Sequence, residues 1–114
     1  MTTLTVEREN GAISALIVSG HAGFAYSGRD IVCAAVSVLI TTGINALEAV
    51  AGVIPEVQQD EMATVISCRV PTELSQQASH DAQVILQTVL QGFEDIAEAY
   101  PKHFKIIDGR KSSC

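Results

Sequence analysis

The sequence has no tryptophan, few prolines and few basic side chains. Its 114 residues include seven Lys or Arg against thirteen Asp or Glu, which gives a formal net charge of −6. A negatively charged surface repels the phosphate backbone of DNA and RNA, so direct nucleic-acid binding is not expected. The same charge attracts a basic protein or peptide, and we expect a partner of that kind.

Targeting and membrane-spanning patterns are also missing. The opening residues MTTLTVEREN contain no basic region followed by an apolar one, which a signal peptide requires. Polar side chains interrupt every apolar run before it reaches the ~18 residues of a membrane span. We therefore expect a cytoplasmic protein that does not contact a membrane.

Cysteine is scarce, and its spacing excludes two kinds of site. The three cysteines, Cys33, Cys68 and Cys114, form an odd number without a C-x-x-C pair. This pattern favours neither a disulfide framework nor a four-cysteine zinc site, and we expect no metal and no cofactor.

The hydrophobic fraction of 47% is typical of a packed globule. The length predicts one domain over residues 1–109, followed by a polar tail over residues 110–114.

Alternating apolar residues predict two hairpins. Residues 3–9 and 12–19 alternate, and Asn10-Gly11 between them tolerates the positive φ angles of a two-residue turn. Residues 54–70 predict a second hairpin with its turn at 59–61. The residues expected to alternate along one face of its second strand are Met62, Thr64, Ile66, Cys68 and Val70.

Two longer stretches have the spacing of helices. Residues 31–53 are almost wholly apolar, with polar residues in one narrow stripe, so this helix must be covered by a sheet and by a second helix or subunit. In residues 78–100 apolar side chains recur every three or four positions, and the pattern ends before Pro101. A short strand over residues 103–107 closes the domain.

The order of these elements is ββαββαβ. It contains two hairpins and lacks the repeated βαβ rhythm of a parallel doubly wound sheet. We therefore predict an α+β fold, a two-layer sandwich with a mostly antiparallel sheet and two helices.

One cysteine stands at the start of a predicted helix. Asp30 is a favourable N-cap residue, and if it caps the helix, Cys33 occupies the third helical position. The free N–H groups and the positive dipole end there favour a thiolate, and they can also hold the oxyanion of an attacked carbonyl. Cys68, by contrast, alternates with apolar neighbours and is expected to be buried, and Cys114 ends a polar tail.

A histidine can reach this cysteine. His21 lies twelve residues upstream, and the intervening loop contains Gly23 and Gly28, so the loop can bring the imidazole back to Cys33 as a general base. Two other interpretations remain open from the residues alone. One is a structural histidine beside a buried cysteine, and the other is metal ligation by His21, Asp30 and Cys33, whose spacing does not match the usual short zinc patterns.

The same segment resembles a known family. His21-Ala22, Gly28 and the run DIVCAAVS over residues 30–37 are similar to the signature of the ribosomal-processing cysteine protease family, called Prp. The resemblance extends to the end of the second helix. It includes Gly92-Phe93, Ala97-Glu98 and Tyr100-Pro101, and it covers essentially the whole chain.

This resemblance implies a function and a set of site residues. It implies a homodimeric cysteine endopeptidase, a hydrolase of ribosome biogenesis in Bacillota-type bacteria, that removes the N-terminal extension of large-subunit ribosomal protein twenty-seven after an aromatic pair. The family's nucleophile falls on Cys33 and its general base on His21, and Gly20, Asp30 and Ser37 match supporting positions. The alternative is a dimeric ribosome-assembly module that binds without catalysis, in which Cys33 is incidental.

Overall fold

In the part of the chain that the structure describes, five strands and two helices follow one another in the predicted order ββαββαβ. The structure is a computed structural model that describes residues 1–20, 28–60 and 62–109, with the backbone alone at residues 28–30. The elements are β1 (Thr2–Glu9), β2 (Ala12–Ser19), α1 (Gly28–Ala49), β3 (Glu56–Asp60), β4 (Val65–Arg69), α2 (Gln76–Ala99) and β5 (Phe104–Asp108).

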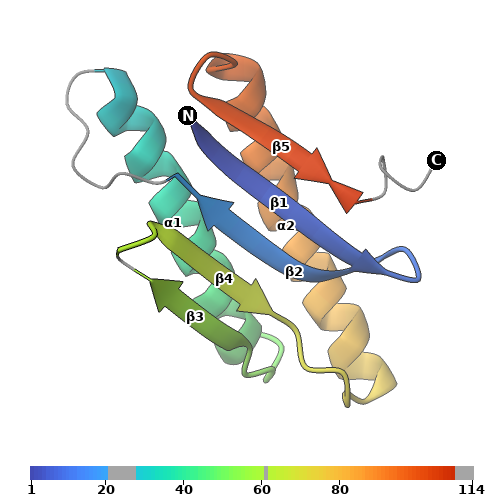
Figure 1. The fold of residues 1–114 in the computed structure, drawn as a ribbon. Coiled ribbons are helices and arrows are strands. Elements are labelled where there is room, and N and C mark those ends of the chain that lie inside the picture. Colours follow the sequence, from blue (N-terminus) through green and yellow to red (C-terminus); the bar gives the residue numbers. More distant parts are fainter. Residues whose placement is uncertain (21–27, 61, 110–114) are drawn as a thin grey trace.

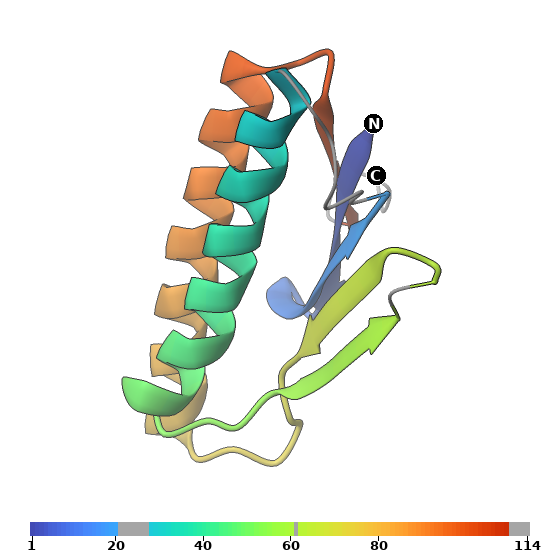
Figure 2. The same cartoon turned by 90° about the vertical axis from the view of Figure 1, so that its left-hand side faces the viewer.

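The strands form one sheet in the order β3-β4-β2-β1-β5. All neighbouring strands are antiparallel except β1 and β5, which are parallel. Both helices lie side by side on one face of this sheet (Figures 1 and 2). The predicted α+β sandwich with a mostly antiparallel sheet is thus confirmed, and β3 and β5 are its two edge strands.

The first hairpin forms as its sequence predicts. Asn10 and Gly11 have φ angles of 53° and 85°, the left-handed conformation that a tight two-residue turn requires. The pairing register shifts once, between Glu7 and Arg8, where the strand bulges.

The second hairpin turns later than predicted. β3 continues through Asp60, and the Asp60 carboxylate accepts hydrogen bonds from the amides of Met62 and Ala63, at 3.0 and 3.1 Å. An aspartate that bonds the following amides stabilises a turn after itself, so the expected turn at 59–61 is wrong. Met62 consequently lies outside the strand with 95% of its surface exposed, whereas Cys68 is buried as predicted.

Helix α1 has the length and apolar character of a membrane span over Ile31–Ala49, by composition alone. In this fold, Val32, Val36 and Ile40 on its inner face belong to the hydrophobic core. The helix ends at Ala49, earlier than the predicted residue 53, because Gly52 is left-handed and the Val53 amide turns back to the Leu47 carbonyl at 2.8 Å. Packing on the sheet and α2 therefore accounts for the apolar residues of this inner face, whereas Ile31 and Val38 are exposed on the outer face.

The two helices approach closely at two glycines. A Cβ atom on Gly92 would lie 2.9 Å from the Leu39 methyl groups, and one on Gly43 would lie 3.3 Å from Val89. Small residues at these points let each helix receive a branched side chain of the other.

On α2, the Ser75 side chain caps the first turn by accepting a hydrogen bond from the Ala78 amide, and the helix ends before Pro101 as predicted.

A buried ion pair joins the first and last strands. The Arg8 guanidinium donates to both carboxylate oxygens of Asp108, at 2.7 and 3.0 Å, and both side chains are 6% exposed. These hydrogen bonds raise the pKa of Arg8 above its ordinary value, although burial opposes the shift. Arg8 also donates to the Gly11 carbonyl and so connects the hairpin turn to the edge strand.

Replacing Arg8 by Met should lower the free energy of unfolding by about 3 kcal/mol, because it removes the positive charge that is paired with the buried Asp108 carboxylate. Arg69→Met is the matched control. It removes the same type of side chain from an ion pair with Glu7 that is almost half exposed, so the loss should be below about 1 kcal/mol. Urea denaturation measures both values, and equal losses would contradict the role of the Arg8 pair.

Candidate active site

Helix α1 begins earlier than expected, and this changes the position of Cys33. The helix starts at Gly28, so Asp30 lies inside its first turn and does not cap it, which makes the N-cap prediction wrong. Acidic residues are favoured in the first turn as well as at the cap, because both positions lie near the positive end of the helix dipole. The aspartate therefore indicated the helix start correctly but not its exact residue.

Cys33 is consequently the sixth helical residue, not the third. Its own amide is beyond the first four N–H groups, which have no partner within a helix. Helical side chains lean toward the N-terminus, so the Cys33 side chain still projects over the first turn. Any oxyanion site built from free helix amides therefore belongs to residues 28–31.

Cys33, Ser37 and Thr41 follow one another at four-residue spacing, so they lie on one face of α1. Cys33 is partly exposed there. Beside this face is a cavity of about 150 Å³ between α1 and the sheet, which we call the α1 cavity. Its walls are Val18, Val36, Ile40 and Ile66, and its polar lining residues are Ser37, Thr41 and Gln59.

The structure thus brings the predicted residues Cys33 and Ser37 to one helix face, and it adds residues that the sequence analysis missed. Thr41 continues the four-residue spacing and could have been found from it. Gln59 and Ile66 lie in β3 and β4, and no local pattern relates them to α1.

Gly20 has a backbone reason to be glycine. It follows the last residue of β2 with a φ angle of 71°, and a Cβ atom would lie 2.7 Å from the Met1 carbonyl oxygen. A larger residue would be strained and would collide with the chain terminus. Gly20 therefore sets the direction in which the chain leaves β2. His21 and Gly23 follow it but lie outside the described residues.

The structure also bears on the two other cysteines and on the hypothesis of a metal site. Cys68 is 1% exposed, and burial raises the pKa of its thiol to about 11, so it is protonated near neutral pH. Cys114 lies outside the described residues. Within the described ranges, no three His, Cys, Asp or Glu side chains are grouped to hold a metal ion.

Comparisons with known proteins assign the chain to a family. The model of the family described as Cysteine protease Prp matches residues 1–105. The ribosomal processing cysteine protease Prp of Bacillus subtilis is 27% identical over 107 residues, which cover 93% of this chain and 96% of that protein.

Solved structures agree with this assignment. The S. aureus ribosomal processing protease Prp in complex with a substrate peptide superimposes with a TM-score of 0.81 at 26% identity, over 95% of this chain and 99% of that one. Its complex with a covalently linked product peptide gives a TM-score of 0.78 at 27% identity, with the same coverage. The chain therefore belongs to the Prp family of ribosomal processing cysteine proteases, which are hydrolases.

Proposed function

We propose that this protein removes the N-terminal extension of large-subunit ribosomal protein twenty-seven, cutting after a pair of aromatic residues. Family membership supports this substrate class. The observation that carries the proposal is the setting of Cys33, a partly exposed thiol on the helix face beside the α1 cavity. The other described cysteine is buried in the core.

In the proposed mechanism Cys33 is the nucleophile and His21 is the general base. His21 takes the thiol proton, and the sulfur attacks the scissile carbonyl carbon to form a tetrahedral intermediate. The free amides at the start of α1 hold its oxyanion. His21 then donates the proton to the leaving amine as the C–N bond breaks, and water hydrolyses the resulting thioester. A covalent intermediate of this kind is consistent with the covalently linked product peptide of the S. aureus relative.

Three further residues support the site in this proposal. Gly20 allows the chain to turn out of β2 just before His21, because only glycine fits against the Met1 carbonyl. Asp30 lies in the first turn of α1, three residues before the nucleophile. Ser37 lies one turn after it and presents a hydroxyl group at the α1 cavity.

The α1 cavity is the proposed subsite for an aromatic side chain. Its volume is about 150 Å³, and an apolar cavity of that size in another protein accommodates benzene. Its walls are aliphatic, and Ser37, Thr41 and Gln59 are its polar lining residues. Since Ser37 lies about 6 Å along the helix from Cys33, one of the two aromatic residues before the scissile bond can occupy this cavity.

We also propose that the enzyme is a cytoplasmic homodimer. The outer face of α1 exposes Ile31 and Val38, at 57% and 63%. These two apolar side chains lie two turns apart on one face of the helix, and self-association would remove them from water. A cytoplasmic location follows from a substrate that is assembled into ribosomes there.

Replacing Cys33 by Ala should abolish cleavage of a peptide that contains the aromatic pair, while the Kd of that peptide stays within about twofold. His21→Ala should lower kcat about 100- to 10,000-fold, because a general base contributes that much. Mass spectrometry of the incubated peptide and a binding titration measure the two effects. Wild-type cleavage by Cys33→Ala would exclude Cys33 as the nucleophile, and binding without cleavage by the wild-type protein would favour the non-enzymatic module.

Iodoacetamide at pH 7.5 should modify Cys33 and leave Cys68 unmodified. The experiment uses Cys114→Ser, which removes the tail thiol. Cys68 is buried, and its pKa is raised to about 11, so its reactive thiolate would form only as the pH approaches that value or the protein unfolds. Peptide mapping gives the modified fraction at each site, with urea-unfolded protein as the control. Equal labelling of both cysteines in the folded protein would contradict the assignment.

Thr41→Phe should fill the mouth of the α1 cavity and raise KM for the aromatic-pair peptide about tenfold. Thr42→Phe is the matched control, because Thr42 is the next residue and is also exposed but does not line the cavity. Steady-state kinetics with both variants separates the two positions. An equal change in KM for the two variants would refute the subsite.

A further inference from the structure

The outer edge of β3 has no strand beside it in the described part of the chain. β3 is the last strand on its side of the sheet, and all five of its residues are exposed. In Figure 1 none of the described segments lies beyond it. Its three central residues, Val57, Gln58 and Gln59, are uncharged, and their pairing with β4 has no bulge. Edge strands are commonly protected by charged side chains, proline or bulges, and the middle of β3 has none of these.

The other edge strand, β5, differs in both respects that matter here. The exposed side chain of Lys105 lies near its start, and the Phe104 amide is already used, because it donates to the Tyr100 carbonyl at 3.1 Å. The α1 cavity has Gln59 of β3 among its lining residues and no residue of β5. The edge beside the proposed substrate site is therefore the unprotected one.

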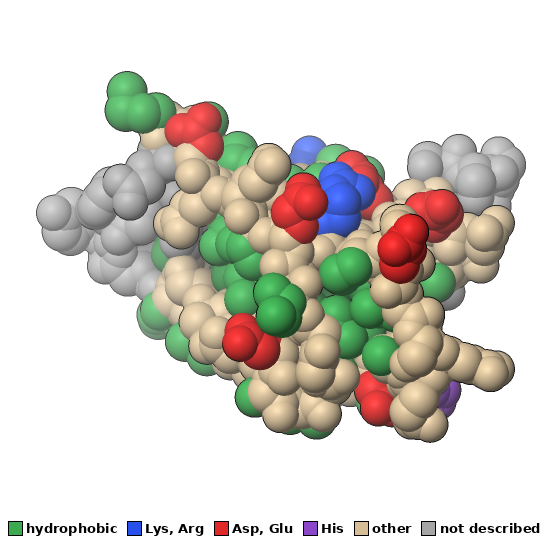
Figure 3. All heavy atoms as spheres, turned by 90° about the horizontal axis from the view of Figure 1, so that it is seen from below, with side chains coloured by type: hydrophobic (Ala, Val, Ile, Leu, Met, Phe, Trp, Pro, Cys, Tyr) green, Lys and Arg blue, Asp and Glu red, His purple; other side chains and the backbone are tan. Residues whose placement is uncertain are grey.

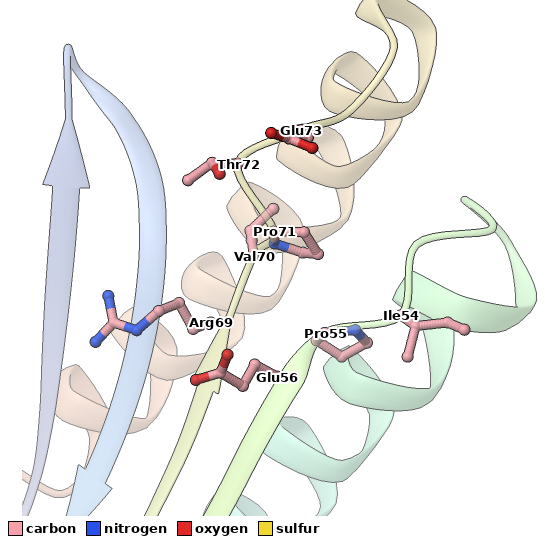
Figure 4. Close-up of a pocket in the computed structure, with 8 residues that line it drawn as sticks. All are labelled: Ile54, Pro55, Glu56, Arg69, Val70, Pro71, Thr72 and Glu73. Atoms are coloured by element: carbon pink, nitrogen blue, oxygen red, sulfur yellow. The ribbon is translucent and has the colours of Figure 1, made fainter.

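The loop that leads into β3 leaves this outer edge open. Ile54 and Pro55, at the end of the loop, line a second hollow, an open groove of about 450 Å³, together with residues of β4 and of the loop after it (Figure 4). Figure 3 views this end of the molecule and shows hydrophobic side chains in the middle of the face. The loop thus approaches β3 from the side of β4 and does not cross the outer edge.

One hydrogen bond next to β4 shows which way the backbone of that strand points. The Val70 amide donates to the Ser14 carbonyl at 3.0 Å, so at Val70 the backbone groups are directed toward β2. Along an antiparallel strand, successive residues direct their N–H and C=O groups to opposite sides. Ser67 is an odd number of residues away from Val70, so its backbone groups are directed toward β3.

The same alternation identifies the free backbone groups of β3. Gln58 is the register partner of Ser67, so its N–H and C=O groups are used in the pairing with β4. The residues on either side of it, Val57 and Gln59, direct their N–H and C=O groups to the outer edge. Two donors and two acceptors therefore face outward at the middle of the strand, at the spacing that another strand requires.

The direction of β3 suits the substrate. β3 runs opposite to α1, because residues 50–55 connect the end of the helix to the start of the strand. Near the end of β3, Gln59 lines the α1 cavity with Ser37 and Thr41. In the proposed mechanism, the residues before the scissile bond approach Cys33 from this cavity. A substrate segment that leads to Cys33 therefore has the same N-to-C direction as β3.

We propose that the substrate residues upstream of the aromatic pair add to the sheet as a strand parallel to β3. The inference rests on the proposed function, because it takes the ribosomal protein precursor as the substrate. In a parallel pair, one residue bonds to the two residues that flank its neighbour. The substrate residue beside Gln58 donates its N–H to the Val57 carbonyl and accepts from the Gln59 amide. The residue two positions earlier accepts from the Val57 amide.

Strand addition assigns affinity and specificity to different parts of the enzyme. Main-chain hydrogen bonds do not depend on side-chain identity, so the β3 edge would hold any extended upstream segment. Selection of the aromatic pair would remain with the α1 cavity. A peptide that begins at the aromatic pair should consequently be cleaved with the same selectivity but with a higher KM than a peptide with the upstream segment.

The first test places a single N-methyl group on successive amides of the four substrate residues before the aromatic pair. An N-methyl group removes one donor and leaves the side chain unchanged. KM should rise about three- to tenfold at alternate positions, since one lost hydrogen bond costs a factor of that size, and should change little at the positions between them. Equal KM values along the segment, or a rise at every position, would overturn the added strand.

The second test removes a donor from the enzyme. Val57→Pro deletes the outward amide, and proline is tolerated on an edge strand where the N–H faces solvent. Val57→Thr is the matched control, because it changes the same half-exposed side chain and keeps the amide. For the long peptide, Val57→Pro should raise KM about three- to tenfold, and Val57→Thr below about twofold. For the peptide that begins at the aromatic pair, neither variant should change KM. Equal effects of the two variants would contradict the proposal.

A binding assay separates this proposal from the proposed function. The N-methyl series is titrated into Cys33→Ala enzyme, so Kd does not depend on cleavage. An alternating pattern in Kd supports the added strand even if wild-type enzyme cleaves nothing. A flat pattern overturns the strand even if wild-type enzyme cleaves the unmodified peptide. Sedimentation of Val57→Pro should show unchanged self-association, and a loss of it would assign the β3 edge to a second copy and overturn the proposal.

Discussion

The close packing of α1 against both the sheet and α2 is the constraint on which the site depends. Gly43 and Gly92 allow the helices to approach until Val89 and Leu39 fill the space that a side chain would occupy. With Val32, Val36 and Ile40 in the core, the rotation of α1 about its axis is determined. The face that carries Cys33, Ser37 and Thr41 must then lie along the α1 cavity. The proposed nucleophile, Cys33, is therefore oriented by the packing of α1 and not by a local motif.

The same helix also relates two concave surfaces of the molecule to each other. Its N-terminal turns carry the Cys33 thiol and the free amides, and the loop after its C-terminal end lines a second hollow together with the loop after β4. A packed helix is stiff, so the separation between the two surfaces is set by the number of residues between them.

Sequence patterns succeeded where the cause was local. The Asn10-Gly11 turn formed as predicted because both residues tolerate the left-handed backbone that the hairpin needs. The predictions failed by a few residues where two local signals compete. Asp60 stabilises a turn after itself, and this extended β3 beyond its expected end. Asp30 is favourable both as the cap and in the first turn of a helix. Its presence therefore did not distinguish the predicted helix start from the observed start at Gly28.

The sequence by itself determined the order of the elements, the acidic charge and the presence of one cysteine near the start of a helix, because periodicity, turn chemistry and composition are properties of neighbouring residues. Only the tertiary structure decided that Gln59 and Ile66 meet Ser37 at one cavity, and that Ile54 and Glu73 share one groove. These residues come from segments far apart in the chain. Their meeting depends on strand register and on how α1 is rotated against the sheet, and both are set by the packing of the whole core.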